Sequence, residues 1–261
     1  MAKHEPKSGT PRRNAPKREL YDRVLIVCED GKSAPYYFEH LRNIYKLSTA
    51  NIEITGKCGS APKSVLEYAK ERKEEEIQKK NPFSKIFCVF DKDKHETYNE
   101  TVKELKKLSN DSVWETALIN SVPCFEYWCL LHFKYVRTLF PIYEGKDGVS
   151  KPVIEKLKEH IPEYEKGKND KNIFQQLYNN LPFAIKHAKQ SLKDAETTET
   201  DNPTTKVHLL VEYLQELNLP IAIKHIETLL SQAQENKMDN VKIRVLEQYL
   251  NQLREKQKLK K

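Results

Sequence analysis

Two short apolar runs decide how this chain folds: RVLIVCE at residues 23–29 and KIFCVFDKD at residues 85–93. Each run is continuous and rich in β-branched residues, which is typical of a strand covered on both faces. Glu29 ends the first run, and Asp91 and Asp93 end the second. In an open parallel sheet, the carboxyl ends of the strands meet at one edge, where such sheets bind ligands. The two runs therefore predict an acidic site at that edge.

Carboxylates gathered at one edge repel one another unless a cation lies between them. Ligation by oxygen alone suits Mg²⁺ or Mn²⁺. We therefore expect Asp91, Asp93 and Glu29 to hold a metal ion, with Glu29 acting as a ligand or as a general base. The alternative is that these residues cap the helices that follow the strands. Two acidic strand ends, one of them doubled, favour the metal site.

Glu126 is a further candidate metal ligand. It lies in NSVPCFEYW at residues 120–128, directly after a predicted strand, and its neighbours are aromatic or aliphatic. A charge that enters a buried helix is costly unless it is paired or bound to metal. Capping of the helix N-terminus is the structural alternative.

Basic and imidazole side chains could contact a substrate. Lys32 follows Gly31, but the segment is not a nucleotide-binding P-loop, because Ile26 stands where that motif needs its first glycine. Lys32 could bind a scissile phosphate as a point charge. Lys94, His132 and His208 are further candidates for substrate binding. Lone histidines on apolar faces are more often core residues, and neither histidine has a partner at zinc-ligand spacing.

The Asp91-x-Asp93 pair also fits a second enzyme class, the phosphatases that use an aspartyl nucleophile. That interpretation is disfavoured because the pair lies on the third predicted strand, and because Lys94 replaces the expected small hydroxyl residue.

Strand and helix patterns alternate through the first half of the chain. The predicted strands are at 22–28, 50–56, 85–90 and 113–119. Alternation with short connections predicts right-handed crossovers and an α/β fold with a parallel sheet flanked by helices. Beyond Gly145 the patterns are helical, at 150–160, 171–190, 204–217, 220–234 and 238–257. We expect a disordered basic leader (1–19), an α/β domain (20–145) and a helical region packed on it (146–261).

Composition sets the wider limits. The chain has 261 residues, of which 32% are charged, with a mean hydropathy of −0.76. No stretch approaches the ~20 apolar residues of a membrane span, and the leader lacks the apolar core of a signal peptide. The five cysteines form no disulfide framework. These features predict a cytoplasmic protein with reduced thiols. A net charge of +7, with the excess at the two ends, slightly favours nucleic acid as a partner.

Glutamate at the first strand and Asp-x-Asp at the third resemble the Toprim fold of topoisomerases, primases and OLD-type nucleases. Longer blocks are similar to the RloB family: VLIVCEDGKSAPYYF at 24–38, VFDKD at 89–93, SVPCFEYWCLLHF at 121–133 and NPTTKVH at 202–208. Asp30 departs from the family, which usually has glycine after the glutamate.

This resemblance implies a phage-defence protein of the abortive-infection type. It implies a Mg²⁺-dependent Toprim endonuclease that cleaves nucleic acid, with tRNA one candidate, beside an ABC/SMC-type ATPase similar to RloA. Self-association is left open. The competing hypothesis is a non-catalytic Toprim-like module whose degenerate site only docks the ATPase.

Overall fold

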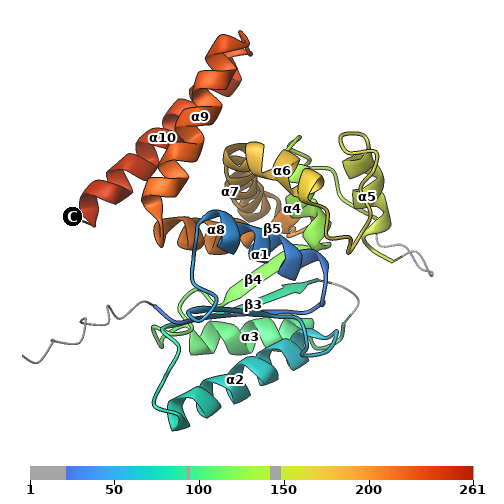
Figure 1. Cartoon of the computed structure of the whole chain (residues 1–261). Coiled ribbons are helices and arrows are strands. Elements are labelled where there is room, and N and C mark those ends of the chain that lie inside the picture. The colour runs from blue at the N-terminus through green and yellow to red at the C-terminus, as the bar shows by residue number, and fades with distance from the viewer. Residues whose placement is uncertain (1–21, 93–94, 142–147, 261) are drawn as a thin grey trace, which may run out of the picture.

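The computed structural model describes residues 22–92, 95–141 and 148–260, so the predicted leader lies outside the described residues. A twisted sheet lies between two layers of helices, and a helical pair extends from one corner (Figure 1). The predicted α/β class, with a helical C-terminal region, is confirmed.

The sheet places the ends of the two diagnostic runs side by side. Its strands are β1 (Val24–Cys28), β2 (Ile52–Thr55), β3 (Lys85–Asp91), β4 (Leu118–Val122) and β5 (Thr204–Thr205). They lie in the order β2-β1-β3-β4-β5, and β1 to β4 are parallel. Cys28 pairs with Val89, and Asp91 pairs with Ser121. The residues that follow β1, β3 and β4 therefore meet at one edge.

One face of the sheet is covered by α2 (Pro62–Gln78) and α3 (Tyr98–Leu108). Both helices lie below the sheet in Figure 1. Side chains alternate across a strand, so Leu25 and Val27 point to this face, where they pack with Leu66 and Leu105.

The opposite face carries the larger core. Here α1 (Ser33–Ile44) and α8 (Val207–Glu216) contact the sheet. The layer continues through α4 (Phe125–Leu131), α5 (Lys151–Lys158), α6 (Lys171–Asn179) and α7 (Leu181–Thr198). Val24 and Ile26 share one buried cluster with Leu210 and Leu214. The two predicted regions therefore share a single core across residue 145.

The last two helices form an antiparallel pair, α9 (Leu219–Glu235) and α10 (Asn240–Leu259). Figure 1 shows this pair leaning away from the sheet. Ile226, Leu246 and Leu250 are buried and belong to the large cluster, so the pair remains packed on the body of the protein at its base.

Two segments differ from the sequence-based prediction. The strand predicted at 113–119 is a turn at its start: the Val113 N–H donates to Asp111 Oδ1 at 3.0 Å, and the Trp114 N–H donates to the Asp111 carbonyl at 2.8 Å. Apolar side chains there cover the core without strand geometry, and β4 starts only at Leu118. Residues 204–205 were predicted to begin a helix. They form β5, antiparallel to β4, and α8 begins at Val207.

Within the part of the chain that the structure describes, no helix is long and apolar enough to cross a membrane.

Candidate functional site

A cavity of about 490 Å³ opens at the carboxyl edge of the sheet. Carboxylates from three elements line it: Glu29 after β1, Asp91 at the end of β3, and Glu126 in the first turn of α4. Asp30, His95 and Lys166 also line it. The sequence-based expectation that Glu29, Asp91 and Glu126 share one edge is therefore matched by the geometry.

Glu29 is held in place by its neighbours. Its backbone N–H donates to the Val89 carbonyl at 2.9 Å, which continues the parallel ladder one residue past β1. Glu29 Oε2 accepts a hydrogen bond from the Asp91 backbone N–H at 2.9 Å, and Oε1 lies 3.3 Å from His95 Nε2. The carboxylate therefore has a fixed position between the two central strands.

Asp91 is the last residue of β3 and is partly exposed to the cavity. Asp93 and Lys94 lie outside the described residues. Among residues 22–92, 95–141 and 148–260, no group of three or more His, Cys, Asp or Glu side chains lies close enough to hold a metal ion. The predicted metal site stays a prediction.

Glu126 is fully buried, at 0% exposure. Ser33 Oγ lies 3.5 Å from Oε1, at the limit of a hydrogen bond, and Lys166 Nζ lies 3.5 Å from Oε2. Oε2 accepts no hydrogen bond from the described residues. The positive end of the α4 dipole and the Lys166 ammonium are the charges that stabilise this carboxylate.

The cysteine next to this carboxylate is not an activated nucleophile. Burial raises the pKa of the Cys124 thiol well above its usual range, and the charges of Glu126 and Asp91 raise it further. A buried thiol beside anions stays protonated.

The turn after β1 is shaped by Asp30. Its carboxylate accepts hydrogen bonds from the Ser33 N–H at 3.3 Å and the Lys32 N–H at 3.4 Å, so it closes the turn that leads into α1. Gly56 lies against this turn: a Cβ on it would be 1.9 Å from the Asp30 carbonyl oxygen. Asp30 therefore stabilises the turn through these two hydrogen bonds.

Lys32 is exposed and does not line the cavity. Its hydrocarbon stem lies beside Gly167, since a Cβ there would be 3.0 Å from Lys32 Cδ. The sequence-based role of Lys32 in binding phosphate stays a prediction, but the structure places another lysine, Lys166, in the cavity wall.

The two candidate histidines lie in the interior, away from the cavity. His132 is 1% exposed; its Nδ1 lies 2.9 Å from the Trp128 carbonyl and its Nε2 lies 3.3 Å from Tyr37 Oη. Burial lowers its pKa to about 3. His208 is 2% exposed, and burial lowers its pKa to about 4. Their burial fits the core alternative better than contact with a substrate.

His95 and Lys166 were missed from the sequence. His95 follows Asp93 closely and could have been suspected from its distance to the acidic strand end. Lys166 lies in a charged stretch far from any motif, and only the packing of residues 159–170 against α4 brings it to Glu126.

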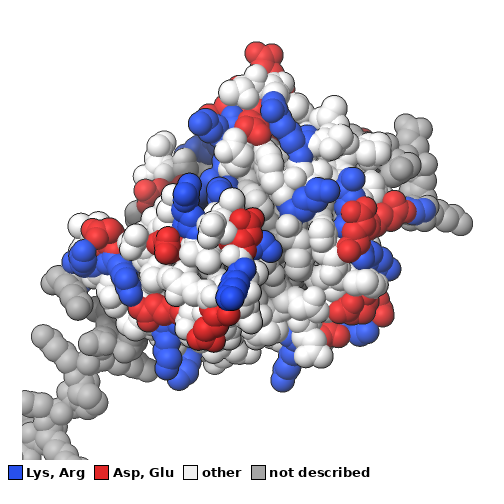
Figure 2. Space-filling model, turned by 90° about the horizontal axis from the view of Figure 1, so that it is seen from above, with Lys and Arg blue, Asp and Glu red and all other residues white. Residues whose placement is uncertain are grey.

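The surface around the helical layer carries both signs of charge. In the view of Figure 2, Lys and Arg side chains alternate with Asp and Glu, and no extended patch of one sign is visible on this face. The basic leader lies outside the described residues. The mixed charges on this face therefore indicate no particular class of ligand, and the charged side chains of the cavity are the better guide.

Comparison with known proteins identifies one matching protein family. A profile of the family described as RloB-like protein matches residues 24–214, which include β1 to β5 and every described residue of the cavity. Comparisons with curated proteins and with solved structures give no match. The match spans well over half of the chain, and the chain therefore belongs to the RloB-like family.

Proposed function

We propose that the protein is a metal-dependent nuclease effector of anti-phage defence that acts with an ABC/SMC-type ATPase. One observation carries the proposal: carboxylates that follow β1, end β3 and begin α4 line a single cavity at the carboxyl edge of a parallel sheet. Open α/β sheets bind ligands at this edge. Membership in the RloB-like family supports a defence-associated role.

The donor set suits Mg²⁺ or Mn²⁺, because Glu29, Asp91 and Glu126 offer only oxygen. Glu126 Oε2, buried and without a hydrogen bond from the described residues, is the donor most in need of a cation. Asp91, Asp93, Glu29 and Glu126 would hold the ion. Such an ion stabilises negative charge on phosphate oxygens and lowers the pKa of bound water.

The remaining groups have roles that follow from their positions. The Asp91 N–H and His95 orient the Glu29 carboxylate, which leaves Glu29 suited to accept a proton from water. The Lys166 ammonium supplies positive charge at the cavity wall, where a phosphate would need it.

The test is phage plating on cells that carry the wild-type protein, Glu29→Gln, Asp91→Ala or Asp93→Ala at matched expression. Glu115→Ala is the control, because Glu115 is exposed and pairs only with Lys85 among the contacts described. We expect the three site variants to lose protection and the control to keep it. Full protection by a folded Asp91→Ala would contradict catalysis. Sequencing of RNA and DNA ends after induction would identify the nucleic acid that is cut.

A second function is a non-catalytic module that only docks the ATPase. The specific observation in its favour is that Glu29 and Glu126 already contact protein nitrogens, those of the His95 ring and the Lys166 ammonium. This alternative predicts that the protein co-purifies with the ATPase. It also predicts no metal-dependent cleavage of nucleic acid after any treatment. Cleavage that disappears in Asp91→Ala would exclude it.

A further inference from the structure

Residues 159–170 join α5 to α6, and one of them, Lys166, lines the acidic cavity. Two side chains anchor the segment in the core: Ile161 is 0% exposed and Tyr164 is 6% exposed. At its end, Asp170 Oδ1 accepts hydrogen bonds from the N–H groups of Asn172 and Ile173, at 2.9 and 3.2 Å, and so caps α6.

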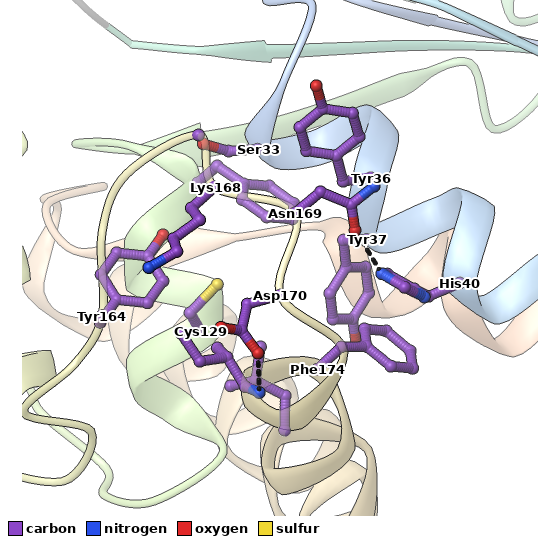
Figure 3. Close-up of a pocket in the computed structure, with 14 residues that line it drawn as sticks. Ser33, Tyr36, Tyr37, His40, Cys129, Tyr164, Lys168, Asn169, Asp170 and Phe174 are labelled. Carbon is purple, nitrogen blue, oxygen red and sulfur yellow. Dashed lines mark hydrogen bonds between the residues drawn. The ribbon is translucent and has the colours of Figure 1, made fainter.

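The same segment is tied to α1. His40 Nε2 lies 2.7 Å from Asn169 Oδ1, and the His40 ring stacks on Phe174 with 4.6 Å between ring centroids. Figure 3 shows this contact, with Tyr164 and Lys168 on the far side of a small neighbouring cavity. Contacts on both sides therefore fix the turn at residues 166–167.

Lys166 lies in this turn and reaches the acidic cavity. Its Nζ is 3.5 Å from Glu126 Oε2, yet its side chain is 45% exposed, whereas Glu126 is 0% exposed. The carboxylate is held in the cavity wall by the packing of α4, but the lysine can rotate about its flexible stem. The nearby Lys168 faces elsewhere: it pairs with Glu165 at 3.2 Å and lines the neighbouring cavity.

We propose that Lys166 binds a phosphate of the nucleic-acid substrate, and that Glu126 competes with this phosphate for the Lys166 ammonium. The inference rests on the proposed function for the class of ligand. Glu126 holds the ammonium at the cavity wall in the free protein. A phosphodiester that enters the cavity offers it exchangeable anionic oxygens on the solvent side.

Two independent features support this assignment. Lys166 is the lysine whose side chain lines the acidic cavity among the described residues. The Lys166 side chain is also 45% exposed, so its ammonium can reach the open side of the cavity, while the Glu126 carboxylate stays at the positive end of α4.

The test measures binding of a fluorescently labelled oligouridylate in EDTA, by anisotropy over a range of salt concentrations. Lys166→Ala should weaken binding about two- to fivefold, the range of a partly exposed ion pair. It should also reduce the salt slope by about 0.7, the value for one phosphate contact on a single strand. Lys168→Ala is the matched control, since it removes the same charge from the same segment and should change both quantities less.

Glu126→Gln tests the competition. It should strengthen binding when Lys166 is present and have no effect in the Lys166→Ala background. Equal effects of Lys166→Ala and Lys168→Ala would overturn the assignment, because only general charge would then matter. An equal gain from Glu126→Gln in both backgrounds would overturn the competition.

This result is separable from nuclease activity, because the binding assay contains no metal ion. Loss of RNA affinity in Lys166→Ala together with full phage protection by Asp91→Ala would refute the nuclease and retain Lys166 as a phosphate-binding residue. Loss of protection by Asp91→Ala, together with unchanged RNA binding by Lys166→Ala, would support the nuclease and refute the phosphate-binding role of Lys166.

Discussion

Burial of His132 should make the protein sensitive to mild acid. The ring is 1% exposed, and burial lowers its pKa from 6.5 to about 3, so the folded protein holds it neutral. The unfolded chain binds a proton below about pH 6.5. Because the unfolded state then binds more protons than the native state, stability falls as pH falls through this range, down to about pH 3.

The size of the effect follows from these two values. At pH 5 the unfolded histidine is almost fully protonated and the buried one is not, so this residue should lower the free energy of unfolding by about 2 kcal/mol relative to pH 8. His208 and His225, whose pKa values burial lowers to about 4, add similar losses, so the share of His132 must be isolated by difference.

The assay is urea unfolding at pH 8 and pH 5 for the wild-type protein, His132→Gln and His160→Gln. Glutamine can still donate to the Trp128 carbonyl, and His160 is exposed, which makes it the matched control. The loss of stability between the two pH values should be about 2 kcal/mol smaller in His132→Gln and unchanged in His160→Gln. Equal losses in all three proteins would mean that His132 is accessible to protons, and would restore it as a candidate for substrate contact.

Three further predictions concern the site and its supports. Saturation with Mg²⁺ at about tenfold its dissociation constant should stabilise the protein by on the order of 1.4 kcal/mol, a rise of roughly 2–5 °C in melting temperature. Asp91→Ala should abolish most of this rise, and an identical rise in the variant would place the ion elsewhere. Gly56→Ala should destabilise the protein by about 1–3 kcal/mol in urea unfolding, because the new Cβ would lie 1.9 Å from the Asp30 carbonyl oxygen. Gly31→Ala is the control and should destabilise the protein less, because the nearest atom to its Cβ would be 3.7 Å away. Equal losses of stability in the two variants would refute the steric argument. Asp170→Ala removes the cap of α6 and should cost about 1 kcal/mol in the same assay, whereas Asp170→Asn should retain most of the stability.

The strands and site residues that depend on a local sequence pattern could be predicted from the sequence alone. The runs that became β1 and β3 are continuous and β-branched, and each places its carboxylate directly at the strand end, so Glu29 and Asp91 could be assigned to one edge. Glu126 could be added because a charge in an apolar helix after a strand is unusual. These inferences needed only strand direction and spacing.

Features that depend on packing between distant segments could not be predicted. Nothing in the local sequence of Lys166 distinguishes it from Lys168, and only the anchors of residues 159–170 turn it toward Glu126. A strand of two residues such as β5 is too short for a periodic pattern. The segment 113–119 was misassigned because apolar residues that cover a core from a turn resemble those of a strand.

The short strand β5 links assembly of the cavity edge to the order of synthesis. Thr204 and Thr205 pair with the end of β4 and precede α8, which covers the same face of the sheet as α1. During translation, β1 to β4 emerge while the outer edge of β4 and part of this face still lack their partners. An unpaired strand edge beside exposed apolar residues favours pairing with other chains. The nascent protein should therefore depend on chaperones until α8 has left the ribosome, and the acidic cavity should reach its final shape only late in synthesis.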